Sequence, residues 1–305
     1  MPNNPIPTAG SPPFPDYAET SPRVRVAPGV ELAYVDRGAG QPIIFIPHWT
    51  FTKEVFEHQV ATLSANYRVI SYDPRSQGES TFAVEGNDYI SHAYDLAALL
   101  EALDVHNPIL AGWGTGALTA WNFISHHGAA SVAANITIDM PPKPLSTTPD
   151  AWSEGSVEGL SAVHTLFLRD ARGHTNYMRR CIETEMVQRD LTQAELDRLL
   201  ALSLKTNPLV TAQLFASGMF ADLTNAAIAA ARQRPTLFFI AQNASHSAVS
   251  FITHLLPESK YVAFGGRMMF WEHHSAFNHV LTEFIHNRVE TQCAPSPAAS
   301  VYAHR

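Results

Sequence analysis

Residues 110–121 read LAGWGTGALTAW. This segment passes from an apolar, strand-like run into a turn with glycine at positions 112, 114 and 116, and then into residues that favour a helix. A strand that runs through a tight glycine turn into a helix is typical of folds in which helices cover a parallel sheet. Ligands of such folds bind at the edge of the sheet where the strands end. The residue at the apex of this turn, Gly114, therefore decides what chemistry the turn can support.

The same alternation of strands and helices continues on both sides of this segment. We expect the first two strands to form an antiparallel hairpin around the turn APG, and the other six to form a mostly parallel sheet with helices on both faces. The expected strands are residues 23–26, 31–34, 43–47, 68–73, 108–113, 134–140, 236–242 and 260–266.

The segment between the sixth and seventh strands is too long to be a simple connection. Connections in α/β folds commonly have about 2 to 6 residues. Residues 142–228 also carry apolar residues at three- and four-residue spacing, which indicates several helices. We expect these residues to form a helical cap over the edge of the sheet, with residues 23–141 and 229–288 as the core.

Composition limits the partners of this chain. It has 305 residues, 46% of them hydrophobic, which suits one large domain with an inserted lobe. The net charge is −8 and no basic stripe is present, so we expect no nucleic-acid partner. No apolar run reaches the roughly 18 residues of a membrane helix, so we expect no membrane span.

The two ends of the chain differ from its middle. Residues 1–22 contain seven prolines and no apolar segment preceded by basic residues, which predicts an arm rather than a secretory signal. Residues 289–305 are expected to form a flexible tail. Cys181 and Cys293 are the two cysteines and lie far apart, so no disulfide framework is expected and a reducing, cytoplasmic location fits best.

Four motifs carry a resemblance to a known family. They are IFIPHW at residues 44–49, YDPRSQGEST at residues 72–81, GWGTG at residues 112–116 and FGGRMMFWEHHSAF at residues 264–277. With the position of the cap, they make residues 24–288 similar to the α/β-hydrolase family, in particular to its cap-bearing members. In that family YDPRSQGEST is a structural loop, so we expect no chemistry from it.

The resemblance implies a catalytic triad that this chain does not have. In the family a serine attacks, a histidine accepts its proton and an acid orients the histidine. These positions fall on Gly114, Arg267 and Asp139. Glycine has no side chain that could attack, and a guanidinium stays protonated and cannot act as a base. We therefore expect no covalent hydrolysis of an ester or amide at this site.

Asp139, Arg267 and Trp49 are the candidate catalytic residues. One interpretation makes Asp139 and Arg267 a buried ion pair that keeps the pocket folded. In the other, Arg267 binds an anionic oxygen while Asp139 holds it in place or accepts a proton. Trp49 lies where the family places an oxyanion donor. The candidate substrate-binding residues are His48, Trp113, Gly114, Thr115, His246 and Trp271; we expect Thr115 to offer its backbone N–H rather than a nucleophile.

Two further features of the sequence bear on its function. Cofactor-free dioxygenases that open quinolone rings also have a Trp after the third strand and an Asp at the end of the sixth, and this local likeness falls on Trp49 and Asp139. The stretch FWEHHSAFNH does not reproduce HExxH, and His274 and His279 are five residues apart, so they do not share a helix face. We expect no metal and no cofactor.

These observations predict a non-hydrolytic enzyme. We expect it to catalyse cyclisation, isomerisation or elimination of an apolar small molecule with an anionic or carbonyl oxygen, in secondary metabolism, by stabilising developing negative charge and holding the substrate in a reactive conformation. One alternative is a catalytically silent, receptor-like protein. The other is a hydrolase of an ester, a lactone or a C–C bond seen as an inactivated variant. A homodimer is compatible with the sequence.

Overall fold

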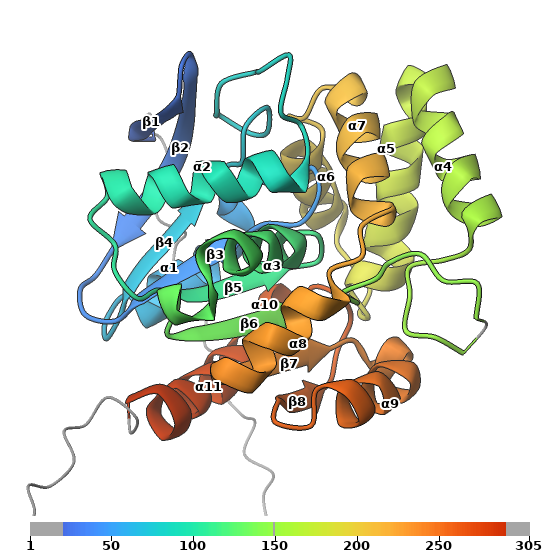
Figure 1. Ribbon diagram of the computed structural model, residues 1–305. Helices are drawn as coiled ribbons and strands as arrows, with labels where there is room; N and C mark the ends of the chain where they lie inside the picture. The colour runs from blue at the N-terminus through green and yellow to red at the C-terminus, as the bar shows by residue number, and fades with distance from the viewer. Residues whose placement is uncertain (1–20, 149, 291–305) are drawn as a thin grey trace, which may run out of the picture.

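The computed structural model describes residues 21–148 and 150–290 (Figure 1). Most of the expected N-terminal arm, residues 291–305 of the expected tail, and Cys293 lie outside the described residues. Cys181 is a buried free thiol.

Within the described residues, eight strands form one sheet, as the sequence predicts. In the order β1-β2-β4-β3-β5-β6-β7-β8, β2 pairs antiparallel with β1 and β4, and all other neighbours are parallel. The central strands are apolar and buried on both faces, which is the pattern of a parallel sheet covered on both sides. The strands are β1 (Arg23–Ala27), β2 (Val30–Arg37), β3 (Pro42–Ile46), β4 (Arg68–Tyr72), β5 (Ile109–Trp113), β6 (Ala134–Ile138), β7 (Thr236–Ile240) and β8 (Lys260–Ala263).

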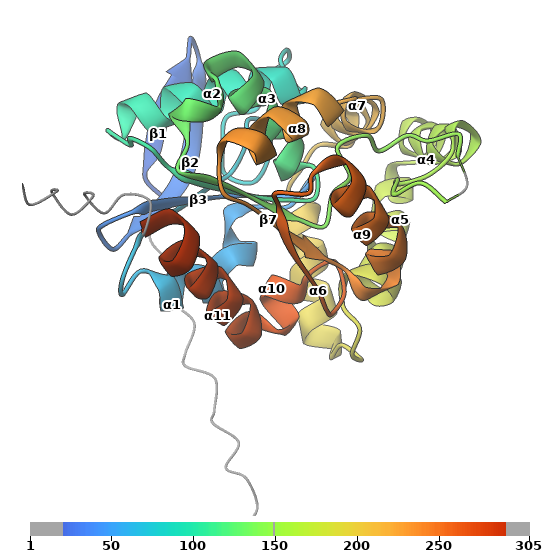
Figure 2. The same cartoon turned by 60° about the horizontal axis from the view of Figure 1, so that its bottom comes forward.

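Helices cover both faces of this sheet (Figure 2). One face carries α2 (Tyr89–Ala102), α3 (Gly116–His127) and α8 (Thr224–Gln233), and the other carries α1 (Glu57–Leu63), α10 (Met269–Glu272) and α11 (His274–Ile285). The remaining core helix, α9 (Ser245–Leu255), lies beside β8. The predicted α/β-hydrolase architecture is therefore confirmed.

In the part of the chain that the structure describes, four helices lie between β6 and α8, within the segment expected to be a cap. They are α4 (Val157–Arg169), α5 (Ala171–Cys181), α6 (Gln193–Ser203) and α7 (Pro208–Met219), and α5 continues into one π-helical turn, η3 (Ile182–Met186). They stand together at one end of the sheet (Figure 1). All four of these helices begin at residues whose side chains accept backbone N–H groups, for example Thr192, which forms a capping box with Glu195.

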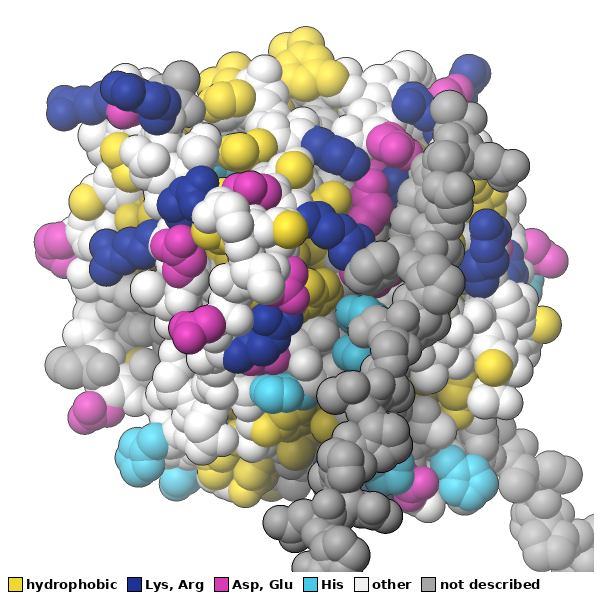
Figure 3. All heavy atoms as spheres, turned by 180° about the vertical axis from the view of Figure 1, so that it is seen from behind, with side chains coloured by type: hydrophobic (Ala, Val, Ile, Leu, Met, Phe, Trp, Pro, Cys, Tyr) yellow, Lys and Arg dark blue, Asp and Glu magenta, His cyan; other side chains and the backbone are white. Residues whose placement is uncertain are grey.

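The expected boundary at residue 228 falls inside α8. This helix packs against α3, so it belongs with the layer that covers the sheet. Among the described residues no single helix is both long and apolar enough to cross a membrane; only the bent pair α7 and α8, at 69° to each other, reaches that length and composition together. On the face seen in Figure 3, basic and acidic side chains are interspersed.

Candidate active site

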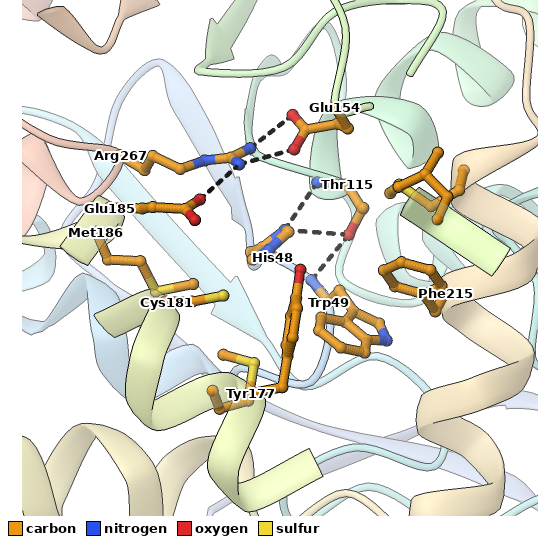
Figure 4. Close-up of a pocket in the computed structure, with 13 residues that line it drawn as sticks. His48, Trp49, Thr115, Glu154, Tyr177, Cys181, Glu185, Met186, Phe215 and Arg267 are labelled. Carbon is orange, nitrogen blue, oxygen red and sulfur yellow. Dashed lines mark hydrogen bonds and ion pairs between the residues drawn. The ribbon is translucent and has the colours of Figure 1, made fainter. Parts of the chain in front are cut away.

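A cavity lies between the carboxyl ends of the central strands and the helices inserted after β6 (Figure 4). We call it the central cavity. It combines aromatic, sulfur-containing and charged side chains, and it brings together four of the sequence-predicted residues. Its lining residues are His48, Trp49, Thr115, Glu154, Leu160, Tyr177, Met178, Cys181, Glu185, Met186, Phe215, Met219 and Arg267.

The turn after β5 needs glycine at its apex. Gly114 has φ +50°, a conformation that side chains rarely adopt, and its N–H donates to the carbonyl of Ile138 at 2.8 Å. A Cβ at this position would lie 2.8 Å from Cγ and 2.9 Å from Cε1 of His48, and nearer still to Nδ1. The imidazole of His48 therefore occupies the space that a nucleophile side chain would need. Glycine has a structural role of its own in this arrangement.

The hydrogen bonds of His48 define its tautomer. The backbone N–H of Thr115 donates to Nδ1 at 3.1 Å. Because a backbone N–H can only donate, Nδ1 carries a lone pair and the neutral ring has its proton on Nε2. Burial, and then the positive charge of Arg267, lower the pKa of His48 well below its usual value, so the ring stays neutral near pH 7. Among residues 21–148 and 150–290 the structure gives Nε2 no hydrogen-bond partner.

The other backbone donor of the site is also paired. The N–H of Trp49 donates to Oγ1 of Thr115 at 2.8 Å. The indole N–H of Trp49 donates to the carbonyl of Thr211 on α7 at 2.9 Å, and its ring packs against Phe215 and Tyr177. The two N–H groups that hold an oxyanion in the family thus meet internal acceptors, His48 and Thr115.

Arg267 lies among three carboxylates. Its Nε is 2.9 Å from Oδ2 of Asp139, its two terminal nitrogens each donate to one oxygen of Glu154 at 2.7 Å, and Nη1 is 3.9 Å from Glu185. Oδ1 of Asp139 accepts the N–H of Ala241 at 2.9 Å. The structure therefore contains the buried ion pair that one reading of the sequence predicts, with Glu154 as a second partner.

Electrostatics keep this guanidinium charged. Burial alone would lower the pKa of Arg267, but the carboxylates of Glu154 and Asp139 outweigh burial and raise it well above its usual value. Burial raises the pKa of Asp139, and Arg267 opposes that shift only in part. With Glu185, the four side chains carry three negative charges and one positive charge, a sum of −2.

Sequence reasoning missed Glu154 and Glu185. Glu154 lies in the loop before α4, and Glu185 lies in the π-helical turn after α5. Their partner, Arg267, is far away in the chain, and neither glutamate belongs to a motif. The packing of the inserted segment on the core brings the two glutamates to Arg267. In the sequence they could be recognised only as acidic residues within the inserted segment.

Three other predicted residues lie away from the central cavity. Trp113 is 1% exposed and packs in the core against Phe51 and Phe270. His246 is exposed near the start of α9. Trp271 lines a separate cavity, where the guanidinium of Arg189 lies 5.4 Å from its ring centroid. Across the described residues, no three His, Cys, Asp or Glu side chains lie close enough together to hold a metal ion.

A family model described as alpha/beta hydrolase fold matches residues 41–273. The chain belongs to this family. A non-heme haloperoxidase of Rhodococcus erythropolis is 32% identical over 135 residues, which are 44% of this chain and 49% of that protein. The chain thus spans about half the length of the curated relatives it matches.

Solved structures show the same fold over most of the chain. An esterase from Exiguobacterium antarcticum has a TM-score of 0.77 at 20% identity, covering 88% of this chain and 100% of that one. An enol-lactonase from Burkholderia xenovorans LB400 has a TM-score of 0.74 at 19% identity, covering 87% and 100%.

These relatives correct the expected function. Curated relatives carry the names of haloperoxidases and, in Acinetobacter calcoaceticus, of a bifunctional esterase/perhydrolase, which point to hydrolase- or peroxidase-type enzymes. The prediction of a non-hydrolytic cyclase, isomerase or lyase is therefore wrong, and the hydrolase alternative is favoured. The relatives lend no support to secondary metabolism, and the local likeness to ring-opening dioxygenases stays a prediction from the sequence.

Proposed function

We propose that this chain is a hydrolase-type enzyme that cleaves an ester or lactone by direct attack of water, without an acyl-enzyme. The family and the named relatives support hydrolysis as the reaction class. The observation that carries the proposal is the position of His48. Its ring fills the place of a nucleophile side chain and has an Nε2–H available at the wall of the central cavity.

His48 polarises the substrate carbonyl in this mechanism. The two ring nitrogens face away from each other, so Nε2–H points away from Thr115. A neutral imidazole that donates one hydrogen bond can stabilise the negative charge that develops on a carbonyl oxygen. Tyr177 extends from α5 toward His48 in Figure 4 and is the candidate for a second donor, because burial raises the pKa of its hydroxyl and keeps it protonated.

Glu185 activates the water. Both oxygens of Glu154 accept hydrogen bonds from Arg267, and both oxygens of Asp139 are also paired. The side chain of Glu185 is 45% exposed and lies 3.9 Å from Nη1 of Arg267, so its oxygens can accept a proton from a water molecule in the cavity.

The proposed reaction has two steps. Glu185 takes a proton from water while the water oxygen forms a bond to the carbonyl carbon, and the carbonyl oxygen becomes an oxyanion that accepts from Nε2–H of His48. The tetrahedral intermediate then breaks its bond to the leaving oxygen, which takes the proton from Glu185. The products are an acid and an alcohol, or a single hydroxy acid from a lactone, and Glu185 is ionised again.

Thr115 does not supply the missing nucleophile. Its Oγ1 accepts the N–H of Trp49, and the nearest ring nitrogen, Nδ1 of His48, is 3.5 Å away. The lone pair of that nitrogen already accepts the N–H of Thr115. No group of the described residues that these contacts place beside Oγ1 is therefore free to remove its proton, which a serine or threonine nucleophile requires.

Glu185→Gln tests the proposal. Measured on a panel of neutral aryl esters and lactones, this variant should lose at least about 100-fold in kcat, because the amide cannot accept the proton from water. Glu183→Gln is the matched control, since Glu183 lies on the same helical turn, is exposed and does not line the cavity. Equal turnover by the two variants would remove Glu185 from the mechanism. Binding of these esters without turnover would favour the receptor-like alternative.

A further inference from the structure

A second cavity adjoins the central cavity. It has a volume of about 300 Å³, and we call it the side cavity. Glu154, Glu185 and Arg267 line both cavities, so these three side chains form the wall between them. The residues that line the side cavity are Asp139, Trp152, Ser153, Glu154, Glu185, Asn243, Ala244, Ser247 and Arg267.

The charges that line the side cavity are unbalanced. Asp139, Glu154 and Glu185 supply three carboxylates, and Arg267 supplies one guanidinium. The guanidinium is engaged by Asp139 and Glu154 at 2.7 to 2.9 Å, which leaves Glu185, among the described residues, with only the longer 3.9 Å contact to Nη1 of Arg267. Charge held in a partly buried site is costly unless it is compensated. A cationic group in the side cavity would supply that compensation, whereas an anion would be repelled.

Trp152 is a second, independent indication of a ligand. Its side chain lines the side cavity and is 7% exposed, with edge contacts to Phe238 and Phe251 at centroid distances of 6.0 and 5.8 Å. Within the part of the chain that the structure describes, its indole N–H has no hydrogen-bond partner. The indole lines the side cavity, so a ligand oxygen there could accept its N–H. An indole ring beside carboxylates also suits an ammonium group.

We propose that the side cavity binds a protonated, hydroxylated amine portion of the substrate, with the ammonium group facing Glu185 and a hydroxyl oxygen accepting from Trp152. This inference rests on the proposed function only in making the bound group a part of the substrate. The scissile carbonyl would then lie in the central cavity at His48, and the amine would lie on the other side of the wall. The substrate class is therefore an ester or lactone that carries an amino alcohol.

Binding of two compounds of matched shape tests this inference without any turnover. Tris(hydroxymethyl)aminomethane is a hydroxylated cation at pH 7, and pentaerythritol is its neutral counterpart. Titrated into the full chain in phosphate buffer and followed by calorimetry or ligand-observed NMR, the cation should bind at least tenfold more tightly than the neutral compound. Equal affinities, or no binding of the cation, would overturn the inference.

Two variants locate the binding. Ser247→Lys places a competing ammonium group in the side cavity and should weaken binding of the cation at least tenfold. Ser250→Lys, on the exposed side of the same helix, α9, should leave it unchanged. Trp152→Phe keeps an aromatic ring but removes the N–H, and should weaken binding several-fold. Unchanged affinity in folded Ser247→Lys would place the cation elsewhere and refute the site.

The same proteins separate this inference from the proposed function. Preference for the cation together with no hydrolysis of any ester would leave the site standing and refute the hydrolase proposal. Hydrolysis of neutral esters without any preference for the cation would support the hydrolase proposal and refute the amine site.

Discussion

Gly114 and His48 form the contact that distinguishes this site at the level of single residues. Two features of the structure favour glycine at this position. Its φ is +50°, and the ring of His48 occupies the place where a Cβ would lie. The second feature predicts that Gly114→Ser does not simply restore a nucleophile, because the serine would have to displace His48. Displacing the ring would also release the backbone N–H of Thr115.

Gly114→Ala should therefore cost more stability than backbone strain alone. A methyl group at a positive φ costs about 1 kcal/mol, and overlap with a packed ring adds about 1 to 3 kcal/mol. Gly29→Ala is the matched control, because Gly29 has φ +73° in the turn between β1 and β2 and no atom within 4 Å of the added Cβ. Unfolding free energies from urea titrations should differ between the two variants by at least about 1 kcal/mol. Equal losses of unfolding free energy would mean that the ring of His48 moves aside easily to accommodate the added methyl group.

Asp139 and Arg267 show how far single residues could be interpreted from sequence. The resemblance aligned both with triad positions, and their chemistry allowed either an ion pair or an anion site. The structure shows the ion pair and adds Glu154, which takes up the donors that an anion would need. No pattern in the sequence pointed to Glu154, because its contact with Arg267 depends on the fold of the loop before α4.

At the level of elements, the strands and core helices could be predicted well. Apolar runs of five residues, separated by turn residues, are strong signals, and each of the eight expected strands overlaps an observed one. The inserted helices were predicted as a group from their spacing. Their packing was not, and it is this packing that places Tyr177 and Glu185 in the central cavity.

His174 on α5 makes the contact between inserted helices and core sensitive to acid. It is 2% exposed, its Nε2 lies 3.2 Å from Oγ of Ser203, and it packs against Trp49. Burial lowers its pKa from 6.5 to about 4. Between pH 6.5 and 4 the unfolded chain binds the proton and the folded chain does not. The free energy of unfolding is therefore fully retained above pH 6.5 and decreases as the pH falls toward 4.

Protonation of His174 should lower the free energy of unfolding by about 3 kcal/mol between pH 6.5 and 4. His48 and His92, whose pKa values burial also lowers, add to the same slope. His174→Gln should lower the stability at pH 7 but flatten its dependence on pH, as measured by urea unfolding at several pH values. His279→Gln, exposed on α11, is the control. An unchanged slope in His174→Gln would show that His174 does not resist protonation in the folded state.

At the level of the whole molecule, the fold was predictable and the function was not. The glycine turn, the order of strands and the position of the insertion all pointed to the same architecture, and the family match confirms it. The expected reaction was wrong because it was argued from two missing triad residues alone. Sequence could not show that His48 takes the place of the side chain at position 114, since these residues meet only when β3 and β5 pair.

The central claim is that water attacks the substrate directly. It is tested most directly by measuring the intact mass of the full chain, quenched with acid during steady-state turnover of an ester, and again after treatment with a fluorophosphonate. The account predicts hydrolysis with the mass of the unmodified protein in both measurements. An acyl or phosphonyl adduct that forms at the rate of turnover, on Thr115, His48 or any other residue, would contradict it.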